Sequence, residues 1–130
     1  MYFESEFASV EWNEAAQVAV MTWKKFVQGD AFKNPCRKAL ELALSKKTKK
    51  WYSDTTNAGV FIKEDRDWFN KEIVVKILQN GINKSALIVP KSTLSLVSLK
   101  AAAEDAQKIG LEIKYFSETT DAIEWLKSLG

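Results

Sequence analysis

Small polar side chains gather at one place in the chain, Asp54-Thr55-Thr56-Asn57, directly after the apolar stretch that begins at Trp51. Carboxylate, hydroxyl and amide groups at consecutive positions could bind a partner, or could offer a hydroxyl to a kinase. Asp and Thr in a loop also hydrogen-bond to nearby backbone groups, which is a purely structural role. The residues alone leave both interpretations open for this segment.

The inventory of reactive side chains argues against catalysis. The chain of 130 residues has no histidine and a single cysteine, Cys36. Triads that need a histidine base are therefore excluded, and metal sites are reduced to carboxylate clusters. Glu64, Asp65 and Asp67 fall in the predicted first turn of a helix, where the helix dipole favours acids. Since there is also no glycine-rich phosphate loop, we expect no enzymatic activity, no metal and no cofactor.

Composition limits the class of partner. The formal net charge is +2 and only two of the 19 basic residues are arginines, so we expect no nucleic-acid ligand. The lone Cys36 rules out an internal disulfide and fits a reducing cytoplasm; a buried small hydrophobe is the expected role, a reactive thiol the alternative. The first residues, MYFESEF, lack signal-peptide features, and no apolar run approaches ~18 residues, so we expect a cytoplasmic chain without an integral membrane segment.

Hydrophobic periodicity predicts one α/β domain over residues 1–130. Alternation predicts strands at 7–12 and 17–23, which a short turn makes antiparallel. Further strands at 51–53, 85–89 and 111–116 alternate with helices, the second at 64–80 and the third from Ser92 to Ile109. The order β-β-α-β-α-β-α-β-α predicts a mostly parallel five-stranded sheet with an antiparallel N-terminal edge strand.

The first helix, capped by Asp30 or Asn34, is predicted to end in the run Lys46-Lys47-Thr48-Lys49-Lys50. Lysines suit the negative end of a helix dipole. An anion-binding surface is the alternative, but a charge run of this kind indicates a solvated helix end.

Ligands of parallel sheets gather beyond the carboxyl ends of the strands. Four loops should share that rim, at residues 23–30, 54–63, 90–92 and 116–120. We therefore expect Asp54 to Asn57, together with Gly59, to form a partner-binding or switch loop. Aromatic residues beside the second helix could instead line a pocket for an apolar ligand, although core packing is the stronger expectation for them. The candidates for such a pocket are Trp23, Trp51, Phe61 and Trp68.

The segment Asp54-Thr55-Thr56-Asn57-Ala58-Gly59-Val60 resembles the hallmark Asp-Ser-Ser-Gly-Leu-Gly-Val of STAS domains in anti-sigma-factor antagonists, the SpoIIAA-like proteins. The whole chain is also similar to the small stand-alone STAS/SEC14-like proteins of Bacteroidetes. That similarity lies in the order of four motifs: Val10-Glu11-Trp12, Trp51 with the Asp54 loop, Glu64-Asp65-Arg66-Asp67-Trp68 and Glu124-Trp125-Leu126.

This resemblance implies a SpoIIAA-like fold and a regulatory protein–protein interaction module, with an anti-sigma factor or a kinase-like regulator as partner. It makes Thr56 the candidate phosphoacceptor. Asn57-Ala58 replace the Gly-Leu of the hallmark, however, and the next helix is predicted to start near residue 63. Thr56 then lies in a loop, out of reach of the helix dipole. The SEC14-like grouping implies the alternative of a carrier or sensor of a small apolar or lipid ligand. A homodimer through the hairpin edge or apolar helix faces is a further expectation.

Overall fold

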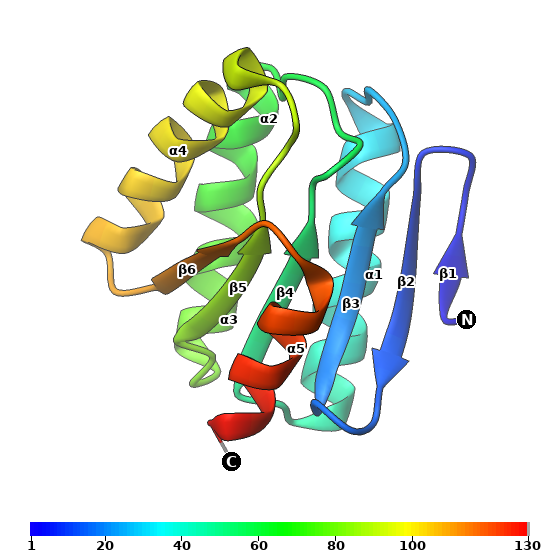
Figure 1. Ribbon diagram of the computed structural model, residues 1–130, viewed down its shortest axis with the longest axis vertical. Coiled ribbons are helices and arrows are strands. Elements are labelled where there is room, and N and C mark those ends of the chain that lie inside the picture. The colour runs from blue at the N-terminus through cyan, green and yellow to red at the C-terminus, as the bar shows by residue number, and fades with distance from the viewer. Residues whose placement is uncertain (130) are drawn as a thin grey trace.

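Six strands form a single sheet in which spatial order follows chain order (Figure 1). The computed structural model describes residues 1–129. The first three strands pair antiparallel, and the third to the sixth pair in parallel. The strands are β1 (Phe3–Glu4), β2 (Ala8–Asn13), β3 (Val18–Trp23), β4 (Lys50–Asp54), β5 (Lys84–Ile88) and β6 (Glu112–Phe116).

The prediction of a mixed, mostly parallel α/β domain is confirmed, but the count of five strands is wrong by one. The edge strand is β1, which pairs Phe3 with Val10 and Glu4 with Ser9. The strand that begins at Ala8 is therefore flanked on both sides. A two-residue strand is too short to produce a period-two pattern, which is why the sequence did not indicate it.

Three helical segments cover one face of the sheet and the last helix covers the other (Figure 1). Successive parallel strands advance in one direction across the sheet, and right-handed crossovers therefore place their connecting helices on the same side. The second segment is continuous from Lys63 to Gln79. The elements are α1 (Asp30–Lys46), α2 (Lys63–Trp68), the π-helical η1 (Phe69–Val74), α3 (Val75–Gln79), α4 (Thr93–Lys108) and, on the opposite face, α5 (Thr119–Ser128).

Several predicted helix boundaries are confirmed by their local geometry. The Ser92 side chain accepts a hydrogen bond from the backbone N–H of Ser95, as expected of an N-cap. Gly81 and Gly110 follow the helices at φ +81° and +117°, a region that L side chains rarely adopt. The second helix begins at Lys63, as the pattern predicted. The loop after β4 is therefore long, and it leaves Thr56 outside the helix.

The larger of two cores lies between the sheet and the three-helix face, and the smaller one lies under α5. Cys36 is in the larger core and is buried, which confirms its expected packing role. Burial, with a smaller contribution from the nearby Asp65 carboxylate, raises the pKa of the Cys36 thiol well above its usual range. The thiol is therefore protonated and unreactive at neutral pH.

The lysine run after α1 is only partly a solvated helix end. Lys47 is exposed and adopts a left-handed conformation that terminates α1. Lys50, in contrast, is buried in β4, and its Nζ donates to the carbonyl of Ala16 at 3.0 Å. The expectation of a uniformly solvated run is wrong at this position, because β4 begins there and the sheet buries it.

Candidate functional site

The carboxyl ends of the parallel strands form the rim that the topology predicted. Thr22 pairs with Asp54, Asp54 with Ile88, and Ile88 with Phe116. The backbone N–H of Thr55 donates to the Ile88 carbonyl at 3.1 Å, which fixes the start of the loop after β4 to the end of β5. The predicted partner-binding loop is thus held at its first residue by the sheet.

The hydroxyls of this loop are engaged locally. Thr55 is 2% exposed, and its Oγ1 donates to the carbonyl of Ile88 at 2.5 Å. The backbone N–H and the hydroxyl of Thr56 both donate to Oδ1 of Asp54, at 3.0 and 2.6 Å. Local hydrogen bonds of this kind are those expected if the Asp and Thr residues have a purely structural role in the loop. Thr56 is partly exposed, whereas the Thr55 hydroxyl faces the protein interior.

The middle of the loop packs against an exposed aromatic ring. Asn57 is exposed, and a Cβ placed on Gly59 would lie 3.1 Å from Cδ1 of Phe26, a tight approach that a larger residue would keep only if the Phe26 ring shifted. Phe26 itself is 51% exposed. The exposed ring of Phe26 therefore lies against the loop at Gly59.

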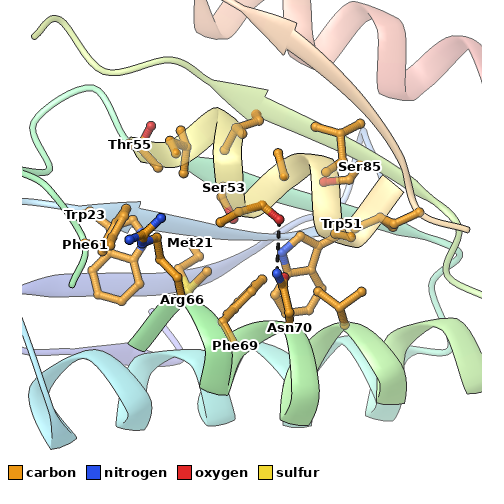
Figure 2. Close-up of a pocket in the computed structure, with 18 of the residues that line it drawn as sticks. Met21, Trp23, Trp51, Ser53, Thr55, Phe61, Arg66, Phe69, Asn70 and Ser85 are labelled. Carbon is orange, nitrogen blue, oxygen red and sulfur yellow. Dashed lines mark hydrogen bonds between the residues drawn. The ribbon is translucent and has the colours of Figure 1, made fainter. Parts of the chain in front are cut away.

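A cavity of about 90 Å³ opens between the sheet and the helical segments α2-η1 and α4 (Figure 2). Three of the four aromatic residues predicted for a pocket line it: Trp23 from β3, Trp51 from β4 and Phe61 from the loop before α2. The strand neighbours of Trp51 and small residues of α4, such as Ala103, complete the wall. Aromatic lining of this kind is typical of sites for small organic ligands.

Trp68 was predicted to belong to this pocket and does not. Its ring stands edge-on to Phe32, with the centroids 6.1 Å apart, and it lies under Lys33 Nζ and the Arg37 guanidinium at 5.5 and 5.2 Å. The side chain therefore packs against α1 instead of the sheet. Its place in the helix directs it there, two residues away from Arg66, which does line the cavity.

Polar groups in the cavity wall were not predicted. Ser53 and Ser85 line it from β4 and β5, and Arg66 and Asn70 line it from α2 and η1. Ser53 lies two residues after Trp51 and Ser85 pairs with Trp51, so strand alternation and register place all three on the same face. That periodicity was the signal in the sequence that could have identified the serines.

Two buried nitrogens at this cavity have no partner within residues 1–129: Nε1 of Trp51 and Nε of Arg66. Trp51 is 3% exposed. The neighbouring Asn70 is partly engaged, since its Nδ2 donates to the carbonyl of Ala102 at 3.0 Å (Figure 2). Buried N–H groups are almost always paired in folded proteins, so two unpaired donors at one cavity require an explanation.

The π-helical segment helps to bring these groups to the cavity. Arg66, Asn70 and Val74 follow one another at four-residue steps, and all three line it. The hydrogen bonds of a π-helix span five residues, so its turn is wider than that of an α-helix. Such segments are rare and are frequent at functional sites. Nothing in the hydrophobic pattern distinguishes this segment from the α-helix that was predicted.

The charge of the lining is one-sided. Among the described residues, Arg66 is the one lining residue with a formal charge, and no carboxylate lines the cavity. Within residues 1–129, Arg66 forms no ion pair with an acidic side chain. In the same part of the chain no cluster of three or more His, Cys, Asp or Glu side chains could hold a metal ion. None of its helices is both long and apolar enough to cross a membrane.

Comparison with solved structures identifies the fold. A crystal structure from Shewanella loihica PV-4, described as an uncharacterized protein of the DUF3478 family with a SpoIIAA-like fold, matches with a TM-score of 0.62 at 17% sequence identity. The match covers 92% of this chain and 91% of that chain. It confirms the SpoIIAA-like fold that the sequence resemblance implied. No family model and no curated protein matches the sequence.

Proposed function

We propose that this chain is a non-enzymatic STAS-type binding module that holds a small, largely apolar ligand in the cavity between β4 and β5 and the helical segments α2-η1 and α4. The observation that carries this proposal is a void beside an unpaired indole N–H, that of Trp51. Protein interiors contain few voids larger than a water molecule, and buried donors are nearly always paired. A bound ligand accounts for both features at once.

The chemistry of the lining supports binding over catalysis. It contains no Asp, Glu, His, Cys, Lys or Tyr. General acid–base catalysis needs a side chain that can exchange a proton near neutral pH, and covalent catalysis needs an activated nucleophile. The hydroxyls of Ser53 and Ser85 have no base among the lining residues that could activate them.

A cavity-filling variant tests this proposal. Ala103 lines the cavity from α4, and Ala103→Leu should fill it. The matched control is Ala101→Leu, two positions earlier on the same helix and exposed. We expect 1-butanol, used as a neutral apolar probe, to change the tryptophan fluorescence and the amide NMR signals around Trp51. Ala103→Leu should abolish these changes and Ala101→Leu should retain them. Changes that are equal in both variants would place the probe elsewhere and contradict the proposal.

The second candidate function is regulatory interaction with a protein partner through the loop at 54–62. The exposed Phe26, which lies against Gly59, favours it, because it offers a partner an apolar side chain at this loop. The loop also contributes Thr55 and Phe61 to the cavity wall. A ligand in the cavity would therefore contact the segment that binds the partner.

Partner binding is tested with Asp54→Ala, Thr56→Glu and Phe26→Ser. Each changes one exposed or partly exposed group at the loop, and each is expected to weaken capture of a protein partner at least several-fold. Ser45→Glu, an exposed position near the end of α1 and away from this rim, is the matched control for the added charge. If the three loop variants capture every wild-type partner as well as the control does, the loop is not the binding surface.

A further inference from the structure

We propose that the ligand of this cavity is a carboxylate on a short apolar chain, whose anionic group accepts hydrogen bonds from Trp51 and Arg66. This rests on the proposed function of the cavity as a ligand site. The side chains around it leave donors unpaired, provide positive charge and offer little room. Each of these three features restricts the chemistry of the occupant.

The first feature is the indole of Trp51. An indole N–H can only donate, so only an acceptor can satisfy it. The ring is 3% exposed and its Nε1 has no partner within residues 1–129. Leaving such a donor unpaired costs about 1–3 kcal/mol. The cavity therefore favours a ligand that brings an oxygen acceptor to this point.

The second feature is Arg66, on the α2 side of the cavity (Figure 2). Its Nε is buried without a partner, and its Nη1 has only a long contact of 3.4 Å with the Ser98 carbonyl. A guanidinium is always charged, and its planar fork matches the two oxygens of a carboxylate. The lining has no carboxylate to compensate this charge. An anion is favoured over an amine, which would meet Arg66 without any counter-charge.

The third feature is the size and the apolar character of the remaining wall. The cavity of about 90 Å³ is smaller than the roughly 150 Å³ that accommodates benzene. Trp23, Phe61 and Phe69 are among the apolar residues that line it. Because the cavity is partly open, a short acid such as butyrate can place its carboxylate inside while the end of its chain reaches toward the opening. A longer fatty acid could place the same carboxylate in the cavity with its chain extending outward.

The experiment compares butyrate, 1-butanol and 1-butylamine with the same protein at pH 7 by NMR titration. These probes share a four-carbon chain and differ in charge. We expect butyrate to bind at least tenfold more tightly than 1-butanol, and 1-butylamine to bind most weakly. Octanoate is the fourth probe. If octanoate binds more tightly than butyrate and depends on Arg66 in the same way, the natural ligand is a longer-chain acid. If octanoate binds more weakly, the natural ligand is a short-chain acid.

Matched variants identify the groups responsible. Arg66→Gln should weaken butyrate binding about 10- to 100-fold and leave the affinity for 1-butanol unchanged. Arg66→Lys keeps the charge but loses the planar fork, so its affinity for butyrate should lie between those of wild type and Arg66→Gln. Arg37→Gln removes the same charge outside the cavity and should have no effect. Trp51→Phe should weaken butyrate binding several-fold. Trp125 does not line the cavity, so Trp125→Phe should leave butyrate binding unchanged.

The outcomes separate this inference from the proposed function. If 1-butanol binds as tightly as butyrate and Arg66→Gln and Arg66→Lys change neither, the carboxylate proposal is wrong while the cavity remains a ligand site. If none of the four probes binds wild-type protein, both proposals are wrong. Folding of each variant is checked by its amide NMR spectrum, and Arg66→Lys provides the test if Arg66→Gln does not fold.

Discussion

Deleting Lys71 is expected to leave the domain folded, whereas deleting Lys38 is expected to unfold it. Lys71 is an exposed residue within the π-helical η1, and Lys38 lies in the middle of the regular helix α1. A π-helical turn holds one residue more than an α-helical turn. Removing Lys71 therefore restores α-helical spacing, and the flanking segments keep their faces toward the core.

The Lys38 deletion cannot be absorbed in this way, because α1 is a regular α-helix without a wide turn. Losing one residue rotates the rest of the helix by about 100°. That rotation would move Leu40, Leu42 and Ala43 away from the core. Each large aliphatic side chain lost from a core costs about 2–5 kcal/mol, so the total approaches the roughly 5–15 kcal/mol that stabilises a typical domain.

Urea unfolding, monitored by circular dichroism, measures the free energy of unfolding of the two deletion variants. The Lys71 deletion should stay within about 1 kcal/mol of wild type, a range typical of exposed changes that keep core packing. It should also lose the butyrate response, since Asn70 and its neighbours would lie differently along the helix. A Lys71 deletion as disruptive as the Lys38 deletion would show that the wide turn is required for folding and is not a local adaptation at the cavity.

The fold could be predicted from the sequence because its signals are periodic and local. Alternation marks β2 and β3, the apolar run Ser85 to Val89 marks β5, and Ser92, Gly81 and Gly110 mark helix boundaries. The late start of α2 at Lys63 was also visible, because acids and an apolar stripe both begin there. What the pattern could not reveal was β1, because its two residues cannot repeat a period-two alternation.

The candidate site was predicted only in its aromatic part. Trp23, Trp51 and Phe61 stand out by residue type, and neighbouring parallel strands bring the first two together. Arg66 was noticed only as one of two arginines and as part of a motif, because nothing in the sequence says that its side chain turns inward. That placement depends on packing between α2-η1 and α4, which are distant from each other in the chain. Contacts between segments that are distant in the chain produce no periodic pattern in the sequence.

Asp65→Ala is expected to destabilise the domain by about 2–4 kcal/mol. The sequence placed Asp65 in the first turn of α2, and the structure agrees, but the side chain is also 2% exposed. Its Oδ2 accepts a hydrogen bond from the backbone N–H of Gly29 at 3.0 Å, directly before the first residue of α1. One carboxylate therefore joins the starts of two helices, and its removal leaves a backbone donor unpaired.

Two further substitutions separate the causes of this effect. Asp65→Asn keeps an oxygen that can accept from Gly29 but loses the charge at the helix start, so we expect a loss of about 1 kcal/mol. Asp67→Ala removes an exposed acid of the same helix, beyond its first turn, one that pairs with Lys63 at 2.7 Å, and should cost no more than about 0.5 kcal/mol. In thermal and urea unfolding, Asp65→Ala should therefore lose the most stability, Asp65→Asn less, and Asp67→Ala the least. Equal losses for Asp65→Ala and Asp67→Ala would mean that the contact of Asp65 with Gly29 does not stabilise the domain. The predicted order would mean that the Gly29 contact fixes the position of α2, and with it the position of Arg66 at the cavity.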